Sequence, residues 1–403
     1  MTADASVHPE WQRRLEQARD EVIPWIEKAI PLVGRTVLEY GCGQGAVACA
    51  IAPRCGRHIG VDIDAGEVAL AEGHVARLGL GNVELHAAAV DEILDHVRGF
   101  AGEVDVILLY AVLEHLTLDE RLAVLRVARE VVRKDGHIVV TETPNRLVPV
   151  DQHTSYLPFF HALPLPLAAQ YYDRSPRKDF VAAVDTADAA GGGAAVEEAL
   201  ARWGWGMSFH EFELVFEDLP AHTVASSYSP LLYPGRPVRW EELQLAATLD
   251  CWRPDLPPCW SRSWIDTILS AEPSPTPRTF VRPWQLQVEH DVPGVAMLPN
   301  DLIELRPLAR LPVQLPGPTS ELQVALTAAA PEGALRVHLP GGDTLSPSAV
   351  PSLPGQPASY AAVRLETPVD RVELELDGGG CIAFVGYAGP ADPALAQGRP
   401  RGW

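Results

Sequence analysis

Residues 37–45 read Val-Leu-Glu-Tyr-Gly-Cys-Gly-Gln-Gly, and this stretch decides how the first part of the chain folds. A short apolar run leads to an acidic residue, Glu39, and glycines follow at positions 41, 43 and 45. Glycine lets a chain turn sharply off a strand and lets the backbone approach a ligand closely. Val61-Asp62 follows at about the distance that one helix and one strand occupy in a mononucleotide-binding unit. The stretch therefore predicts a strand that ends in a ligand-binding loop.

The spacing of these residues resembles motif I of the class I S-adenosylmethionine (SAM) dependent methyltransferases. A carboxylate at Glu39, before the loop, suits a cationic ligand better than a pyrophosphate. Gly41, Gly43 and Ala46 also satisfy the G-x-G-x-x-G/A pattern of dinucleotide-binding proteins, which is a weak signal alone. Dehydrogenases have no systematic preference for Glu two residues before the first glycine. SAM is therefore favoured over a nicotinamide cofactor and over a purely structural glycine turn.

Composition restricts the partners and the compartment. The chain has 403 residues, enough for two or three domains, and a formal net charge of −21 from 53 acidic and 32 basic residues. Such a surface repels phosphate backbones and anionic lipid, so we expect neither nucleic acid nor a membrane as partner. Six cysteines show no metal-binding or paired spacing, and no signal peptide or long apolar stretch is evident. These features predict a cytoplasmic protein, and they leave a homo-oligomer open.

Strands and helices alternate from residue 36 onward, which indicates a parallel sheet. Two capping boxes, Asp64-Ala-Gly-Glu67 and Thr117-Leu-Asp-Glu120, mark the starts of helices. A further helix is expected over residues 9–30, with a kink at Pro24. The expected strands are 36–40, 58–63, 83–87, 104–110 and 136–142. The pattern predicts an α/β fold: a Rossmann-like, doubly wound methyltransferase core over residues 1–150.

The rest of the chain divides by composition. Residues 151–285 hold seven of the ten tryptophans and predict a substrate cap, in which the rings either pack the interior or stack on sugar or aryl groups. Apolar residues alternate over residues 286–392, and Gly and Pro separate the short runs. This pattern predicts a C-terminal antiparallel β-sandwich, a type of module that often binds carbohydrate or mediates assembly. Residues 393–403 are expected to be a disordered tail.

The methyltransferase resemblance implies roles for individual residues around SAM. In that family the acidic residue that ends the second strand holds the ribose hydroxyls, which corresponds here to Asp62, and Ile63 then lies against the adenine. After the third strand the family places Asp beside a small residue. This chain has Ala88-Ala89-Val90 there, and Asp91 comes two residues after the position where the family has its Asp. The expected cofactor-binding residues are Glu39, Gly41, Cys42, Gly43, Gly45, Asp62, Ile63, Ala89, Val90 and Tyr110.

Residues 110–116, Tyr-Ala-Val-Leu-Glu-His-Leu, resemble a segment of ubiquinone-pathway (UbiG-like) and related small-molecule or sugar O-methyltransferases. There, a Glu-x-x-Glu-His motif is associated with a divalent metal. Glu114 and His115 match the motif, but Ala111 replaces the first Glu, so a hard cation loses an oxygen ligand and no metal is expected. A cation site made of His115, Asp151 and His153 is the alternative, because mixed His and carboxylate ligands suit Mn²⁺ or Zn²⁺.

The predicted reaction is methyl transfer from SAM to a hydroxyl of a sugar, a polysaccharide precursor or a natural product. Positioning supplies much of the rate in an in-line displacement, and a neutral imidazole is the usual acceptor of the hydroxyl proton. His115 and His153 are the candidate bases; Asp151 either orients His153 or binds a sugar hydroxyl. A purely structural role for each His is the alternative. Two other functions stay open: methylation of a carboxylate or amine on a peptide-like substrate, and a non-catalytic SAM-fold subunit that binds a partner.

Overall fold

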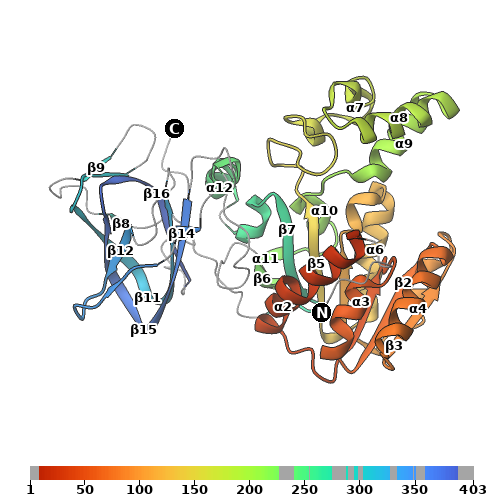
Figure 1. Cartoon of the computed structure of the whole chain (residues 1–403), viewed down its shortest axis with the longest axis horizontal. Helices are drawn as coiled ribbons and strands as arrows, with labels where there is room; N and C mark the ends of the chain where they lie inside the picture. The colour runs from red at the N-terminus through yellow and green to blue at the C-terminus, as the bar shows by residue number, and fades with distance from the viewer. Residues whose placement is uncertain are drawn as a thin grey trace. The chain divides into compact units, whose positions relative to one another are not determined.

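The computed structural model describes residues 9–226, 240–253, 255–274, 287–288, 295–297, 303–326, 334–347, 349–350 and 359–388. The chain forms two compact units (Figure 1), Met1–Ser227 with Ser263–Pro277 and Tyr228–Arg262 with Arg278–Trp403. Each unit contains one β-sheet. None of the helices in these described ranges has an apolar stretch long enough to cross a lipid bilayer.

The first unit is built on a seven-stranded sheet in the order β3-β2-β1-β4-β5-β7-β6. Strands β1 to β5 run parallel; β7 pairs antiparallel with β5, and β6 pairs antiparallel with β7. The strands are β1 (Thr36–Tyr40), β2 (Arg57–Asp62), β3 (Val83–Ala87), β4 (Val104–Tyr110), β5 (Val132–Pro144), β6 (Thr223–Ser226) and β7 (Trp264–Ser270). The predicted doubly wound α/β core is confirmed.

The strand order reverses between β1 and β4, which are hydrogen-bonded neighbours. Ligands of open α/β sheets bind at such a switch point, outside the carboxyl ends of the strands. The glycine loop after β1 and the Glu114-His115 segment after β4 therefore start from adjacent strands. Every residue of β4 is buried, as expected for a central parallel strand.

Helices of the first half cover the sheet: α1 (Pro9–Gln17), α2 (Ile23–Ala29), α3 (Ala46–Ile51), α4 (Ala65–Leu78), α5 (Ile93–Arg98) and α6 (Leu118–Val131). Asp64 caps α4 by accepting from the N–H groups of Gly66 and Glu67. Thr117 and Glu120 form the predicted reciprocal capping box at α6. The helix expected over residues 9–30 forms as α1, a π-helical turn over Ala18–Val22 and α2, with Pro24 in the first turn of α2.

The region between β5 and β7 adds short helices: α7 (Leu165–Ala168), α8 (Lys178–Gly191), α9 (Gly193–Gly204), α10 (Phe209–Glu213) and α11 (Leu219–His222). Phe160, Phe180 and Trp205 form the centre of its apolar cluster, which confirms a packing role for one of the tryptophans. This part of the predicted cap also supplies β6 and β7 to the sheet. The boundaries at residues 150 and 285 stay predictions.

The second unit contains α12 (Trp240–Trp252) and a nine-stranded antiparallel sheet. Its strands are β8 (Gln287–Val288), β9 (Val295–Met297), β10 (Ile303–Leu305), β11 (Arg310–Leu326), β12 (Leu335–His338), β13 (Thr344–Leu345), β14 (Ala349–Val350), β15 (Ser359–Leu376) and β16 (Gly380–Ala388). Alternating side chains of β11 and β15 build its core, as the period-2 pattern predicted. The antiparallel C-terminal sheet is confirmed, and the domain bounds 286–392 stay a prediction; the predicted tail, 393–403, lies outside the described residues.

Candidate active site

Two adjacent cavities lie at the carboxyl edge of the parallel strands and share part of their walls. The first has a volume of about 290 Å³ and is lined by the glycine loop. The second has a volume of about 370 Å³ and contains the two candidate histidines. Glu10, Arg14 and Tyr110 line both of them. We refer to them as the loop cavity and the histidine cavity.

The glycine loop has a backbone shape that requires glycine. Gly41, Gly43 and Gly45 have φ values of +79°, +45° and +73°, which side chains disfavour. A Cβ atom on Gly41 would lie 2.7 Å from Cγ2 of Val112, and one on Gly45 would lie 2.8 Å from Cβ of Ala71. The first two glycines line the loop cavity with Glu39 and Cys42, whereas Gly45 allows α3 to pack closely on α4.

Glu39 is buried at the end of β1, and its Oε2 atom lies 3.2 Å from Nε2 of His58. Burial raises the pKa of the Glu39 carboxyl, and His58 acts in the opposite direction. A cation in the loop cavity would favour the ionised carboxylate. Burial likewise raises the pKa of the Cys42 thiol, which stays protonated at neutral pH. Cys42 therefore contributes shape to the cavity.

Asp62 contacts the glycine loop directly. Its Oδ2 atom accepts a hydrogen bond of 2.7 Å from the N–H of Gly43, and its Oδ1 atom accepts one of 3.0 Å from the N–H of Asp64. Ile63 and Val90 are exposed beyond the ends of β2 and β3, as is Ala89. None of these four residues is among the residues that line the loop cavity, so their roles toward ribose and adenine stay predictions.

Helix α1 covers both cavities, which the sequence did not predict. Nε1 of Trp11 donates to the carbonyl of Gln44, and the Trp11 ring lies 4.3 Å from the ring of His74. At the other end of the helix, Nε2 of Gln17 donates to Oε1 of Glu142 over 3.0 Å. Between them, the Arg14 guanidinium lies 5.6 Å from the centre of the Tyr110 ring.

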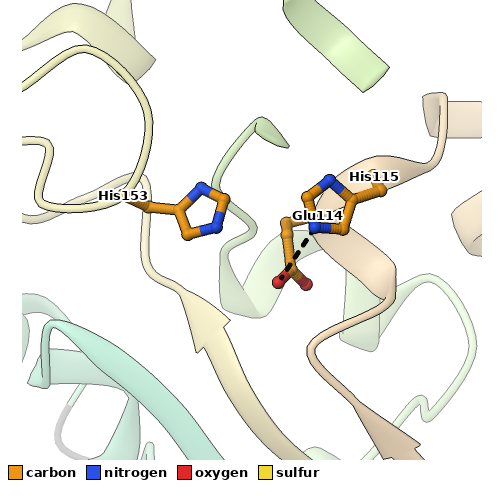
Figure 2. A group of neighbouring side chains, drawn as sticks. All are labelled: Glu114, His115 and His153. Carbon is orange, nitrogen blue, oxygen red and sulfur yellow. Dashed lines mark ion pairs between the residues drawn. The ribbon is translucent and has the colours of Figure 1, made fainter. Parts of the chain in front are cut away.

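Glu114, His115 and His153 come together in the histidine cavity (Figure 2). One ligand atom from each, two imidazole nitrogens and a carboxylate oxygen, lies within 4.8 Å of the other two. Glu114 and His115 follow β4, and His153 comes from the loop after β5. Among the residues that the structure describes, these three side chains form a group that could hold a metal ion. The sequence had placed Asp151 in that cluster, and the structure brings Glu114 there.

The hydrogen-bond network assigns the same tautomer to both histidines. Nδ1 of His115 lies 2.9 Å from the carbonyl of Arg202, so Nδ1 carries the proton and donates. Nδ1 of His153 lies 3.1 Å from Oγ1 of Thr154, and that hydroxyl donates its own proton to the carbonyl of Gly204. Oγ1 must therefore accept from His153. Both imidazoles consequently have their lone pair on Nε2.

His153 is neutral near pH 7. Burial lowers the pKa of His153 to about 4, and the nearby His115 acts in the same direction. The two rings meet edge to face, with their centres 5.6 Å apart. A neutral imidazole with a free lone pair is able to accept a proton.

Asp151 is buried behind the cavity and is not among its lining residues. Its carboxylate accepts hydrogen bonds from the main-chain N–H groups of His153, Thr154 and Ser155 and from the Ser155 hydroxyl. Although burial opposes ionisation, His161 and these donors lower the pKa of Asp151. Asp151 thus holds the backbone of the loop that presents His153; within the described residues its carboxylate forms no hydrogen bond or ion pair with the His153 ring.

Comparison with known proteins shows what part of this chain resembles. Residues 37–136 match the family described as "Methyltransferase domain". The chain is 28% identical over 127 residues to the ubiquinone biosynthesis O-methyltransferase of Acinetobacter baumannii (strain ACICU), covering 31% of this chain and 52% of the relative. The corresponding protein of Pseudomonas paraeruginosa is 27% identical over 148 residues, covering 36% of this chain and 61% of the relative. The chain thus spans about half the length of the first of these relatives.

Two solved methyltransferase structures each resemble about a third of the chain. Magnesium protoporphyrin IX methyltransferase from Synechocystis PCC 6803, with bound SAM, is 21% identical, has a TM-score of 0.29, and is matched over 36% of this chain and 64% of that one. Phosphoethanolamine N-methyltransferase 1 of Haemonchus contortus is 19% identical with a TM-score of 0.28, over 33% and 27% of the two chains. Likeness at this level does not bear on the acceptor.

Proposed function

We propose that the chain transfers the methyl group of SAM to a hydroxyl of a small polar acceptor, a function supported by the match of residues 37–136 to a methyltransferase domain and by their similarity to O-methyltransferases. A sugar, a polysaccharide precursor or a natural product fits this description. One observation carries the proposal: the loop cavity and the histidine cavity share the wall formed by Glu10, Arg14 and Tyr110. SAM in the first cavity would present its methyl group to an acceptor in the second.

The two histidines support a hydroxyl acceptor. A hydroxyl must lose its proton during transfer, and a correctly placed base contributes roughly 10²–10⁴-fold to the rate. Nε2 of His115 is the proton acceptor in this proposal, because its ring is half-exposed in the cavity and its Nδ1–H is held by the Arg202 carbonyl. His153 lies beside it with its own Nε2 lone pair, and Asp151 positions the loop that carries it.

The lining of the histidine cavity supports a polar acceptor. It includes three arginines, three glutamates and two glutamines, as well as the two histidines. Tyr156 and Trp264 add aromatic surface on which a sugar ring can stack. An extended apolar acceptor would cover these polar groups without offering them hydrogen bonds, which is unfavourable. We also propose that the enzyme works in the cytoplasm, where the described cysteines would persist as free thiols.

The test combines cofactor binding with turnover. Calorimetric titration with S-adenosylhomocysteine should show binding to the parent chain, and Asp62→Ala should weaken it. Methyl transfer from labelled SAM is then measured on a panel of hydroxyl, carboxyl and amine acceptors. His115→Asn should lower kcat by about 100-fold or more on a hydroxyl acceptor without changing affinity for S-adenosylhomocysteine.

Two results would contradict the proposal. Unchanged turnover in His115→Asn and His153→Asn would point to a carboxylate acceptor, which needs no base. Failure to bind S-adenosylhomocysteine at millimolar concentration would favour a non-catalytic, partner-binding role for the fold.

A further inference from the structure

We propose that Glu114, His115 and His153 form a binding site for one divalent transition-metal ion of the Zn²⁺ type. The inference rests on the proposed function only in its location, because the three residues lie in the proposed acceptor cavity. Two imidazole nitrogens and one carboxylate oxygen are a common three-ligand set for Zn²⁺ sites that keep a fourth position open. Ala111 replaces the first glutamate of the Glu-x-x-Glu-His motif, so that ligand is lost. His153 supplies the third ligand from another loop.

The distances suit such an ion after small side-chain rotations. The three ligand atoms lie within 4.8 Å of one another, and Nε2 of His115 is 3.7 Å from Oε1 of Glu114. Ligand bonds of about 2.0–2.1 Å in a tetrahedral site place neighbouring ligand atoms roughly 3.3 Å apart. In Figure 2 one nitrogen of each ring and the carboxylate of Glu114 face the same space.

The ligands are oriented for a cation before any ion arrives. Metal-binding histidines usually donate their other N–H to a carbonyl or a similar acceptor, which fixes the tautomer. Both histidines do so here, to the Arg202 carbonyl and to the Thr154 hydroxyl. Their Nε2 lone pairs are therefore available to a metal.

The buried carboxylate of Glu114 is the strongest argument for a bound cation. Its side chain is fully buried, yet neither carboxylate oxygen accepts a hydrogen bond from any residue in the described ranges. Its main-chain carbonyl is fixed by the Trp205 N–H and by Nη2 of Arg121, so the position of the residue is set. A buried carboxylate without a hydrogen-bond donor is costly, and a bound cation removes that cost.

The neighbouring positive charges do not prevent cation binding. Arg13 and Arg14 are both paired with Glu10, at 2.6 and 4.0 Å, and Arg177 is paired with Asp179 and also donates to the His153 carbonyl. The ligand chemistry also selects the ion. Mg²⁺ prefers several oxygen ligands, whereas imidazole suits Zn²⁺ and its neighbours. We therefore expect Zn²⁺ to bind and Mg²⁺ not to compete.

The test uses the full chain after treatment with a chelator. Calorimetric titration with ZnCl₂ should give one ion per chain, and excess MgCl₂ should leave the titration unchanged. Co²⁺ in place of Zn²⁺ should produce the visible absorption of a four-coordinate site. Glu114→Gln and His153→Asn should each weaken Zn²⁺ binding by about tenfold or more. His210→Asn, which alters an exposed histidine outside the cavity, should bind like the parent chain.

Thermal melting of each variant without metal establishes that it is folded. Absence of the one-site titration in the parent chain, or equal Zn²⁺ affinity in the parent chain and both folded site variants, would overturn the metal site.

Methyl transfer measured with and without Zn²⁺ tests the proposed function separately. A bound ion occupies the Nε2 lone pairs, so Zn²⁺ should inhibit an enzyme that uses His115 as base. Activation by Zn²⁺ would support the metal site and overturn the proposed base.

Discussion

Gly41 and Gly34 provide a matched pair for testing the glycine loop at the scale of single residues. Both have positive φ values, +79° and +74°, but only at Gly41 would a Cβ meet another atom, Cγ2 of Val112 at 2.7 Å. Gly41→Ala should lower the free energy of unfolding by roughly 1–3 kcal/mol and abolish measurable affinity for S-adenosylhomocysteine. Gly34→Ala should lower the free energy of unfolding only through its strained backbone angle and should keep the affinity for S-adenosylhomocysteine. Calorimetry and thermal denaturation check both; full affinity in a folded Gly41→Ala chain would contradict the assignment of this loop to the cofactor.

The ion pair between Arg202 and Glu120 predicts a pH-dependent contribution to stability. Nη1 and Nη2 of Arg202 contact the two carboxylate oxygens at 2.6 and 2.9 Å, and this contact, helped by Thr117, lowers the pKa of Glu120 to about 2. The folded-state pKa lies below the ordinary value of 4.5. The contribution is therefore complete above about pH 4.5 and disappears as the pH falls toward about 2.

Arg202→Gln should lower the free energy of unfolding at pH 7 by about 0.5–1 kcal/mol, because the pair is partly exposed to solvent. Urea denaturation at pH 7 and at pH 3.5 measures the difference from the parent chain, which should shrink at the lower pH. The control is Glu198→Gln, since Glu198 lies 3.8 Å from Arg202 and is far more exposed. A difference that grows on acidification would show that the pair does not set this pKa.

Sequence reasoning at this scale identified residues but not their geometry. The glycine spacing predicted the loop, because backbone angles restrict the residue type locally. The pairing of Glu114 with His153 was missed, because it depends on where the loop after β5 returns to the sheet. Asp151 looked like a partner for the His153 ring from its position two residues earlier. Its carboxylate binds the backbone of its own loop, a contact that Asp commonly makes in turns.

At the scale of elements, α1 is expected to retain the cofactor. Trp11 joins this helix to the loop through its hydrogen bond to Gln44 and its ring contact with His74. Trp11→Ala should weaken S-adenosylhomocysteine binding by about 1–2 kcal/mol, which corresponds to roughly five- to thirtyfold. Trp11→Phe keeps an aromatic ring and should recover part of the affinity. Trp252→Ala alters a tryptophan that is 70% exposed and should have no effect; equal affinity in all three variants would rule out a retaining role for α1.

Elements with a strong local pattern were predicted, and elements defined by long-range pairing were not. The capping box at Thr117 and the period of the first five strands identified the α/β core. Strand β7 was missed, because a strand that pairs antiparallel with β5 across more than a hundred residues leaves only a short apolar run in the sequence. The Gly-rich stretch at 191–193 forms a tight junction between α8 and α9, where Gly192 has a φ of +67°.

At the scale of the whole molecule, both candidate cavities lie in one unit. Every residue that lines the loop cavity or the histidine cavity belongs to the first unit, between Glu10 and Trp264. The described strands of the C-terminal sheet have their own core, built from Leu322, Val324, Leu374 and their neighbours. An independent core means that the sheet does not need the cofactor domain for its packing. The described residues of this sheet line neither cavity, so any contribution it makes to function comes from outside them.

Removal of residues 290–403 tests that contribution. The shortened chain should keep its affinity for S-adenosylhomocysteine, because both cavities retain all their lining residues. If the C-terminal domain binds glycan, it raises the effective concentration of a polymeric acceptor, and its loss should lower methylation of a polymer by about 10²-fold while small acceptors are unaffected. Methyl transfer to a polysaccharide and to its monosaccharide, compared in the same assay, measures this ratio. An equal decrease on both acceptors would show instead that the domain supports folding of the first unit, and a melting curve of the shortened chain distinguishes the two cases.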